Sequence, residues 1–359
     1  FFFHTGRKVM TMRMKSLRVQ PLILFLFFLA SVSLTNSALT EEFRTEQYHA
    51  RGYTWPPSYV TPNTTGWNYL SSRRFEQAEY TISTKEKYDL WLQSISSAVV
   101  QPNFTETGWG LTRAPAELIQ ELRDTVNTAY EKGDYRTEHE VEVITGDPPL
   151  FIDRPKLTHR VLQELLPLHE AWAGVPLVSY TAYGFRLYRN DSSLYMHVDK
   201  PDTHVISCIL HIDSSDDAED WPIVIEDYFG NTNEVVLTPG DMLFYESSKC
   251  FHGRPTKFIG SWYSSVFVHY YPNTEEWKRD ERSLEGHYAI PLHWADIASG
   301  EQQTAKAHVV GTGLIEPECE GNWCLLSESI KWKGPATDGM VLTTDGHMYP
   351  LFEEEEEEL

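Results

Sequence analysis

The residues of this sequence best suited to chemistry are two histidines and an aspartate. His197 and Asp199 are separated by a single residue, and His252 lies far downstream. Two imidazoles and one carboxylate are the facial triad typical of non-haem iron(II) sites, in which three protein ligands leave the opposite positions of an octahedron open for co-substrate and oxygen. A His-x-Asp triplet alone is common, so this prediction depends on the elements around it.

Short runs with strand-like patterns surround these residues and alternate with turn signals. Tyr183–Arg189 is rich in aromatic and apolar residues and meets the turn formers Asn190–Ser193. Because strand side chains repeat every two residues, we expect His197 and Asp199 on the same face of the next extended segment. Further strands are predicted at residues 204–213, 221–226, 234–237, 242–245 and 261–271. Seven or eight short strands indicate a sandwich or barrel, which would bring the distant histidine beside this pair.

Helices are predicted before the barrel. Pro115–Lys132 has apolar residues at helical spacing, a proline near its first turn and Gly133 at its end. A second helix is predicted at residues 156–173, where Pro167 should kink or divide it. A helical pattern also covers residues 85–99. The fold class that follows is mostly β with flanking helices.

The order of these motifs resembles the iron(II)/2-oxoglutarate-dependent dioxygenases and, within them, the prolyl 4-hydroxylase-like group. The elements that carry the resemblance are Tyr188, His197-x-Asp199, Ser207 and His211 on an apolar strand, Pro239-Gly240-Asp241-x-Leu243-Phe244-Tyr245, and His252. The resemblance covers roughly residues 155–272 and implies a double-stranded β-helix (jelly-roll) core. It implies that His197, Asp199 and His252 bind Fe(II), with 2-oxoglutarate and O2 as co-substrates and ascorbate as reductant. It also implies a peptide or protein substrate, of which a prolyl residue is one candidate.

One position departs from the pattern of that family. Its members usually carry an Arg or Lys nine to ten residues after the distal histidine, to pair with the far carboxylate of 2-oxoglutarate, and here Ser261 and Trp262 occupy those positions. Arg254 is the preferred replacement, because two residues beyond His252 a continuing strand would point it to the same side. Its planar fork also suits a carboxylate. Lys257 is the second candidate, and a surface role for Arg254 is the plain alternative.

Two further residues and two other functions complete the hypothesis. Tyr188 and His211 lie where the family often has a hydroxyl or imidazole donor to the co-substrate. The same motif would suit a catalytically inactive jelly-roll protein that only binds a ligand or metal. It would also suit a cupin-like metalloenzyme that uses no keto acid. Release of succinate separates the oxygenase from both alternatives.

The beginning of the chain predicts the secretory pathway. Basic residues precede the apolar run Pro21–Val32, and small or polar residues follow it, as in a cleaved secretory signal. The run is shorter than the ~20 apolar residues that a membrane span needs, so we expect no stable span, with a retained signal anchor as the alternative. Sequons at Asn63, Asn103 and Asn190 agree with a glycoprotein of the endoplasmic reticulum lumen or a secreted one.

Composition and cysteine usage set further limits. The net charge of −22 argues against nucleic acid, whose phosphates require clustered Lys and Arg. Cys319 and Cys324 are close enough for a local loop. Cys208 and Cys250 lie on predicted core strands, where they are either bonded to each other or buried thiols, and buried thiols are the preferred prediction. The predicted organisation is a signal peptide with upstream residues (1–38), a helical or irregular support region (39–154), the dioxygenase core (155–272), a C-terminal extension (273–352) and a disordered acidic tail (353–359).

Overall fold

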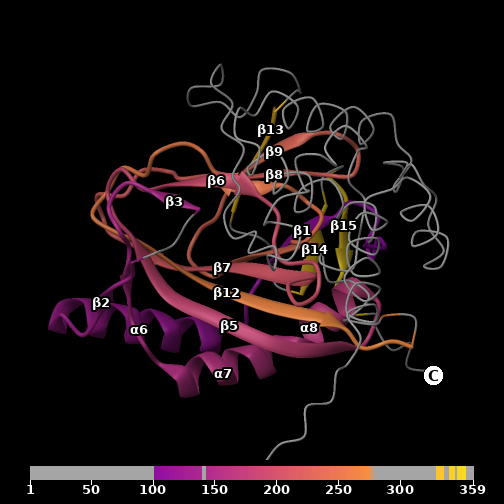
Figure 1. Ribbon diagram of the computed structural model, residues 1–359, viewed down its shortest axis with the longest axis horizontal. Coiled ribbons are helices and arrows are strands. Elements are labelled where there is room, and N and C mark those ends of the chain that lie inside the picture. The colour runs from indigo at the N-terminus through magenta and orange to yellow at the C-terminus, as the bar shows by residue number, and fades with distance from the viewer. Residues whose placement is uncertain are drawn as a thin grey trace, which may run out of the picture.

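The structure is a computed structural model that describes residues 101–139, 143–275, 277, 329–334, 339–343 and 346–352. The predictions on the signal segment, the helix at 85–99, the Asn63 sequon, Cys319 with Cys324, and the acidic tail lie outside these residues. The described chain forms two β-sheets, one above the other, with helices beneath the larger sheet (Figure 1). No helix of the described part is both long and apolar enough to cross a membrane.

The strands are divided between two sheets, a larger and a smaller one. The larger sheet contains β1 (Trp109–Arg113), β2 (Arg136–Thr137), β4 (Leu150–Phe151), β5 (Leu177–Tyr188), β7 (Ile206–Ser214), β10 (Asp241–Tyr245), β12 (Tyr263–Pro272), β14 (Met340–Leu342) and β15 (Met348–Pro350). The smaller sheet contains β3 (Ile144–Thr145), β6 (Ser193–His197), β8 (Ile223–Glu226), β9 (Thr232–Val236), β11 (His252–Arg254) and β13 (Ser329–Lys333).

The strand order identifies the fold. The larger sheet runs β15-β14-β1-β10-β7-β12-β5-β4-β2, and the smaller runs β13-β9-β8-β11-β6-β3. Along the chain from β5 to β12, strands pass repeatedly between the sheets, so that β5, β7, β10 and β12 pair in one and β6, β8, β9 and β11 in the other. This alternation is a double-stranded β-helix, and it confirms the fold class predicted from the sequence.

In the described part of the chain, three helices cover the outer face of the larger sheet. They are α6 (Ala116–Lys132), α7 (Pro155–Glu164) and α8 (Leu166–Ala173). Leu118, Leu122 and Val126 repeat at helical spacing and are buried in the cluster beneath the sheet. Gly133 ends α6 in the left-handed region, with a φ of 67°. The second predicted helix is divided into α7 and α8 just before Pro167. Proline has no backbone N–H to continue the helical hydrogen bonds, which accounts for the division.

Strand alternation separates the two faces of the larger sheet. On β7, Cys208 and Leu210 pack in the cluster with the helices, whereas Ile209 packs in the cluster between the sheets. Ser207 and His211 therefore share the inner side with Ile209. This inner side is where the strands bring polar residues together between the two sheets.

Two strand predictions were wrong in detail. Asp199 was expected on an extended segment with His197, but β6 ends at His197 and Asp199 follows it outside the strand. The ladder stops there because its partner β11 has only three residues and begins at His252. The segment Trp109–Arg113, which the sequence placed in an irregular region, is β1 and pairs with β10 in the larger sheet.

Candidate metal centre

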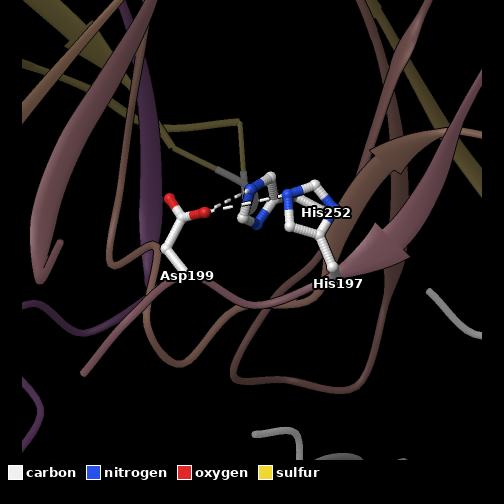
Figure 2. Close-up of side chains that lie close together, drawn as sticks. All are labelled: His197, Asp199 and His252. Atoms are coloured by element: carbon white, nitrogen blue, oxygen red, sulfur yellow. Dashed lines mark ion pairs between the residues drawn. The ribbon is translucent and has the colours of Figure 1, made fainter. Parts of the chain in front are cut away.

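The pairing of β6 with β11 brings the two histidines together. The strands are antiparallel, and their register sets His252 directly opposite His197. Asp199 follows β6 after one residue, and its backbone N–H donates to the carbonyl of Ser247 at 2.8 Å. The three side chains point toward one another from the end of β6 and the start of β11 (Figure 2). The structure thus assembles the three residues that the sequence selected.

The distances between donor atoms suit a shared cation. One ligand atom from each of His197, Asp199 and His252 lies within 4.8 Å of the others. Nε2 of His197 is 3.7 Å and Nε2 of His252 is 3.9 Å from the Oδ1 atom of Asp199. These separations exceed a hydrogen bond. The three groups therefore face a common point instead of bonding to one another.

Backbone carbonyls set which nitrogen of each imidazole is free. Nδ1 of His197 lies 2.7 Å from the carbonyl oxygen of Tyr195, and Nδ1 of His252 lies 2.9 Å from that of Cys250. A carbonyl only accepts, so each Nδ1 carries the proton and each Nε2 keeps its lone pair. Burial lowers the pKa of both His197 and His252 to about 4, which keeps them neutral. Neutral imidazoles held in this way are the form that binds metals.

Asp199 retains an unused acceptor. Its Oδ2 atom is buried and has no hydrogen-bond partner among the described residues. A buried carboxylate oxygen without a partner is costly, because the charge has left water without compensation. A bound cation would supply that compensation, so the donor set fits a divalent metal such as iron(II).

Arg254 is buried beyond the triad on the same short strand. Only 2% of its surface is exposed. Its Nη2 atom donates to the hydroxyl of Tyr263 at 3.2 Å, and Nη1 donates to the carbonyl of Trp221. The guanidinium lies between the two rings, 4.5 Å from the centroid of Trp221 and 4.7 Å from that of Tyr263. No carboxylate of the described chain pairs with it.

The alternative cation, Lys257, lies at the surface. Its side chain is 69% exposed, and its Nζ atom is 3.8 Å from a carboxylate oxygen of Asp191. Ser261 is also exposed, and Trp262 packs with the helices on the outer side of the larger sheet. Of these four positions, the structure buries a cation only at Arg254.

Tyr188 and His211 line the same interior region as Arg254. Tyr188 stacks edge to face on Trp221, and its buried hydroxyl has no hydrogen-bond partner in the described chain. His211 stacks parallel to Tyr263, with ring centroids 4.0 Å apart, and its Nδ1 atom lies 3.0 Å from the Ser264 carbonyl. Burial lowers the pKa of His211 to about 3, so it is a neutral hydrogen-bonding group.

Sequence reasoning missed a second buried arginine and its partner. Nε of Arg186 donates to Glu138 at 2.6 Å, and Tyr183 also donates to this carboxylate. Glu138 lies just after β2, so this network closes one edge of the barrel. The available signal was Arg186 itself, a cation within the aromatic strand β5. The sequence could not show its acidic partner, because Glu138 is distant in the chain.

Comparisons with known proteins find similarity only among solved structures. No protein-family model matches the sequence, and no significant match is found among curated proteins. Among solved structures, a prolyl 4-hydroxylase from Pseudomonas putida is 16% identical; the match covers 47% of this chain and 95% of that one, with a TM-score of 0.36.

Two other solved structures match this chain to a similar extent. A prolyl hydroxylase from Trichoplax adhaerens, in complex with a peptide fragment of hypoxia inducible factor, is 12% identical over 52% of this chain and 90% of that one, with a TM-score of 0.37. A member of the 2OG-Fe(II) oxygenase family from Burkholderia pseudomallei is 14% identical over 53% of this chain and 92% of that one, with a TM-score of 0.35. At such identities the chemistry must be argued from this chain's own residues.

Proposed function

We propose that this protein is an iron(II)- and 2-oxoglutarate-dependent oxygenase that hydroxylates a peptide or protein substrate, for which a prolyl residue is one candidate. The observation that carries the proposal is the meeting of His197, Asp199 and His252, with both Nε2 atoms unprotonated and directed to a common point. Such a triad holds a metal on one face only and leaves positions open for reactants.

The co-substrate site is proposed beyond the triad, at Arg254. A buried guanidinium with no carboxylate partner is stable only if an anion or strong acceptors compensate its charge. The far carboxylate of 2-oxoglutarate provides such an anion, and the planar fork of Arg254 can bind it through two hydrogen bonds. The hydroxyl of Tyr188, which lacks a partner, is a second donor in the same region.

The protein's contribution to the reaction is placement and exclusion of water. Bound iron(II), with 2-oxoglutarate and O2, supplies the oxidation of a substrate C–H bond to C–OH, coupled to the release of succinate and carbon dioxide. The two histidines and Asp199 hold the metal, while Arg254 and Tyr188 orient the keto acid. The buried aromatic cluster of Trp221, Phe258 and Tyr263 surrounds this region and keeps water from it.

The proposal is tested without turnover by an anaerobic optical titration. Iron(II) chelated by a 2-oxo acid absorbs visible light, and a protein that provides the three ligands should develop this band as 2-oxoglutarate is added. We expect the band in the wild type and its loss in Asp199→Ala. If neither iron(II) nor 2-oxoglutarate changes the spectrum of the wild type, the oxygenase proposal is wrong.

The titration also separates the cupin-like alternative. A metalloenzyme without a keto acid would bind iron(II) through the same triad, but 2-oxoglutarate would leave its spectrum unchanged. The buried, carboxylate-free Arg254 favours the keto acid, since a cupin-like site gives no reason to bury that charge.

Localisation in the secretory pathway is proposed together with a preferred glycosylation site. Asn190 is exposed at a turn, next to Asp191 with a φ of 65°. Asn103, in contrast, is half-buried and accepts a hydrogen bond from the buried Lys249, while Thr105 donates to Glu246 at 2.8 Å. Removal of N-glycans should therefore shift the mass of the secreted wild type, and Asn190→Gln should reduce that shift more than Asn103→Gln.

A further inference from the structure

The turn between β10 and β11 carries two carbonyl groups that contact the candidate metal ligands. This turn consists of residues 246–250. The carbonyl oxygen of Ser247 accepts the backbone N–H of Asp199 at 2.8 Å, and the carbonyl oxygen of Cys250 lies 2.9 Å from the Nδ1 atom of His252. The position of the 246–250 turn therefore sets both the backbone at Asp199 and the ring orientation of His252.

An upstream segment holds the first residue of this turn. Glu246 is buried, and its carboxylate accepts hydrogen bonds from two consecutive residues of that segment. The backbone N–H and the hydroxyl of Thr105 both donate to Oε1 at 2.8 Å, and the backbone N–H of Phe104 donates to Oε2 at 3.1 Å. In return, the backbone N–H of Glu246 donates to the carbonyl of Gly108 at 2.9 Å.

A buried lysine fastens the other half of the turn to the same segment. The Nζ atom of Lys249 donates to the carbonyl of Gln101 at 2.7 Å and to the Oδ1 atom of Asn103. Burial raises the pKa of Glu246, and the positive charge of Lys249 limits that rise. Lysine is almost never fully buried unless its charge is compensated, so these contacts are specific. We call the hydrogen bonds of Glu246 and Lys249 to residues 101–105 the clamp.

The clamping segment also contacts the loop that carries Asp199. The side-chain amide of Gln101 is buried and donates to the carbonyl of Pro201 at 2.5 Å, two residues after Asp199. Residues 101–105 form neither a helix nor a strand. Their contacts with the rest of the chain therefore join two loops next to the candidate metal centre.

We propose that Glu246 and Lys249 are positioning residues for the metal site. Their clamp fixes the 246–250 turn, and the turn holds Asp199 and His252 in the geometry that binds the metal. The inference rests on the proposed function and deepens it, because it assigns a role to groups outside the triad. Such outer groups commonly orient metal ligands.

Three substitutions probe the clamp with little change in side-chain size. Lys249→Met removes the ammonium group and keeps a long unbranched side chain. Thr105→Val removes the hydroxyl that donates to Glu246, whereas Thr105→Ser keeps a hydroxyl. Thr112→Val is the matched control, because Thr112 is buried and its hydroxyl donates to the carbonyl of Met340 at 2.7 Å, where β1 meets β14.

We would titrate each protein with Co(II) by calorimetry and record the visible spectrum of the bound cobalt. We expect Lys249→Met to bind Co(II) about 10–100-fold more weakly than the wild type, the usual effect of losing an outer group. Thr105→Val should bind about threefold to tenfold more weakly, which corresponds to one lost hydrogen bond. Thr105→Ser and Thr112→Val should stay within about twofold of the wild type, less than one lost hydrogen bond would cause.

The spectrum at saturation distinguishes positioning from general stability. Displaced ligands should alter the spectrum of cobalt bound to Lys249→Met, whereas a protein that is only less stable gives the wild-type spectrum once it is saturated. Wild-type affinity in both Lys249→Met and Thr105→Val would overturn the inference. Equal losses in Thr105→Val and Thr112→Val, or in Thr105→Val and Thr105→Ser, would also overturn it. If Lys249→Met does not fold, the threonine variants decide alone.

Hydrogen exchange in the metal-free protein tests the clamp independently of the proposed function. The backbone N–H of Asp199 should exchange faster in Lys249→Met than in the wild type, because its acceptor lies in the 246–250 turn, while the amides of β5 should keep their protection. Unchanged exchange at Asp199 would refute the clamp. If the wild type binds no Co(II), the proposed metal site is refuted instead. If the wild type and the clamp variants bind Co(II) equally, only the role of the clamp is lost.

Discussion

Gly253 on β11 packs directly against the backbone of Tyr195 on β6. A β-carbon at Gly253 would lie 2.7 Å from the carbonyl oxygen of Tyr195, closer than real β-carbons approach. That carbonyl also fixes the tautomer of His197, at 2.7 Å from its Nδ1 atom. The absence of a side chain at Gly253 therefore allows the two strands that carry the histidines to approach each other.

Gly253→Ala should weaken metal binding. The added methyl group must push β11 away from β6 or displace the Tyr195 carbonyl, because the neighbouring atoms are backbone. Either movement disturbs His252 or His197, so we expect a loss of affinity for Co(II) of at least about tenfold, the scale seen when outer contacts of metal ligands are lost. Calorimetric titration measures the change.

Gly133→Ala provides the matched control. This glycine ends α6 with a φ of 67° and has open space where a β-carbon would lie. Alanine there costs about 1–2 kcal/mol of stability because the left-handed conformation disfavours a β-carbon. Metal affinity should stay at the wild-type level. A similar loss of affinity in both variants would mean that general destabilisation, not the contact with β6, explains the effect.

Arg254→Ala should raise the 2-oxoglutarate concentration needed for half-maximal succinate release by about 10–100-fold, because a charge-assisted hydrogen bond contributes about 1.5–3 kcal/mol. Arg254→Lys should raise this 2-oxoglutarate concentration by less than Arg254→Ala does, since lysine keeps the charge but loses the planar fork. Lys257→Ala is the surface control and should change nothing. A larger effect at Lys257 than at Arg254 would show that the co-substrate site has been assigned to the wrong cation.

Glu138→Gln should destabilise the protein by about 3 kcal/mol at neutral pH, because the substitution leaves the buried Arg186 without its counter-charge. Urea unfolding measures this difference. The surface pair of Arg160 and Glu164 serves as the control, and Glu164→Gln should change the free energy of unfolding by less than about 0.5 kcal/mol. Equal effects of the two substitutions would contradict the buried pairing.

The effect of Glu138→Gln should also depend on pH. Burial alone would raise the pKa of Glu138, but hydrogen bonding and the charge of Arg186 outweigh burial and lower it below the ordinary value of 4.5. The carboxylate therefore contributes its stability above pH 4.5, and this contribution is lost as the pH falls through the lowered pKa. The difference between the wild type and the variant should shrink in acid; a constant difference would show that charge is not its cause.

Cys208 and Cys250 should resist alkylation in the native protein. Both are free and buried, and burial raises the pKa of each thiol, so little reactive thiolate forms. Peptide mapping after treatment with iodoacetamide should find them modified in urea but not in native buffer. Rapid native modification of Cys250 would indicate that the segment before His252 opens to solvent.

The three proposed metal ligands could be selected from the sequence because their signal is local. His197 and Asp199 form a recognisable triplet, and His252 follows a predicted turn and strand in the order that the fold requires. The sequence could not show that His252 pairs with His197, since register between distant strands depends on packing of the whole barrel. It also overestimated the length of β6, because the strand can extend only as far as its short partner.

Other elements could not be predicted because their partners are distant. Strand β1 has five residues that are mostly buried, so it shows no alternation of polar and apolar positions. Ser207 on β7 is hydrogen-bonded to His269 on β12 and to Ser247 in the turn after β10, and none of these residues is unusual alone. Such interior polar residues become informative only when the inner face of the sheet is known.

The most direct test of the account is succinate release by the purified protein supplied with iron(II), ascorbate, oxygen and 2-oxoglutarate. We predict succinate from the wild type, slowly even without a peptide substrate, and none above background from Asp199→Ala. The same background from both proteins would contradict the central claim that His197, Asp199 and His252 hold a catalytic metal.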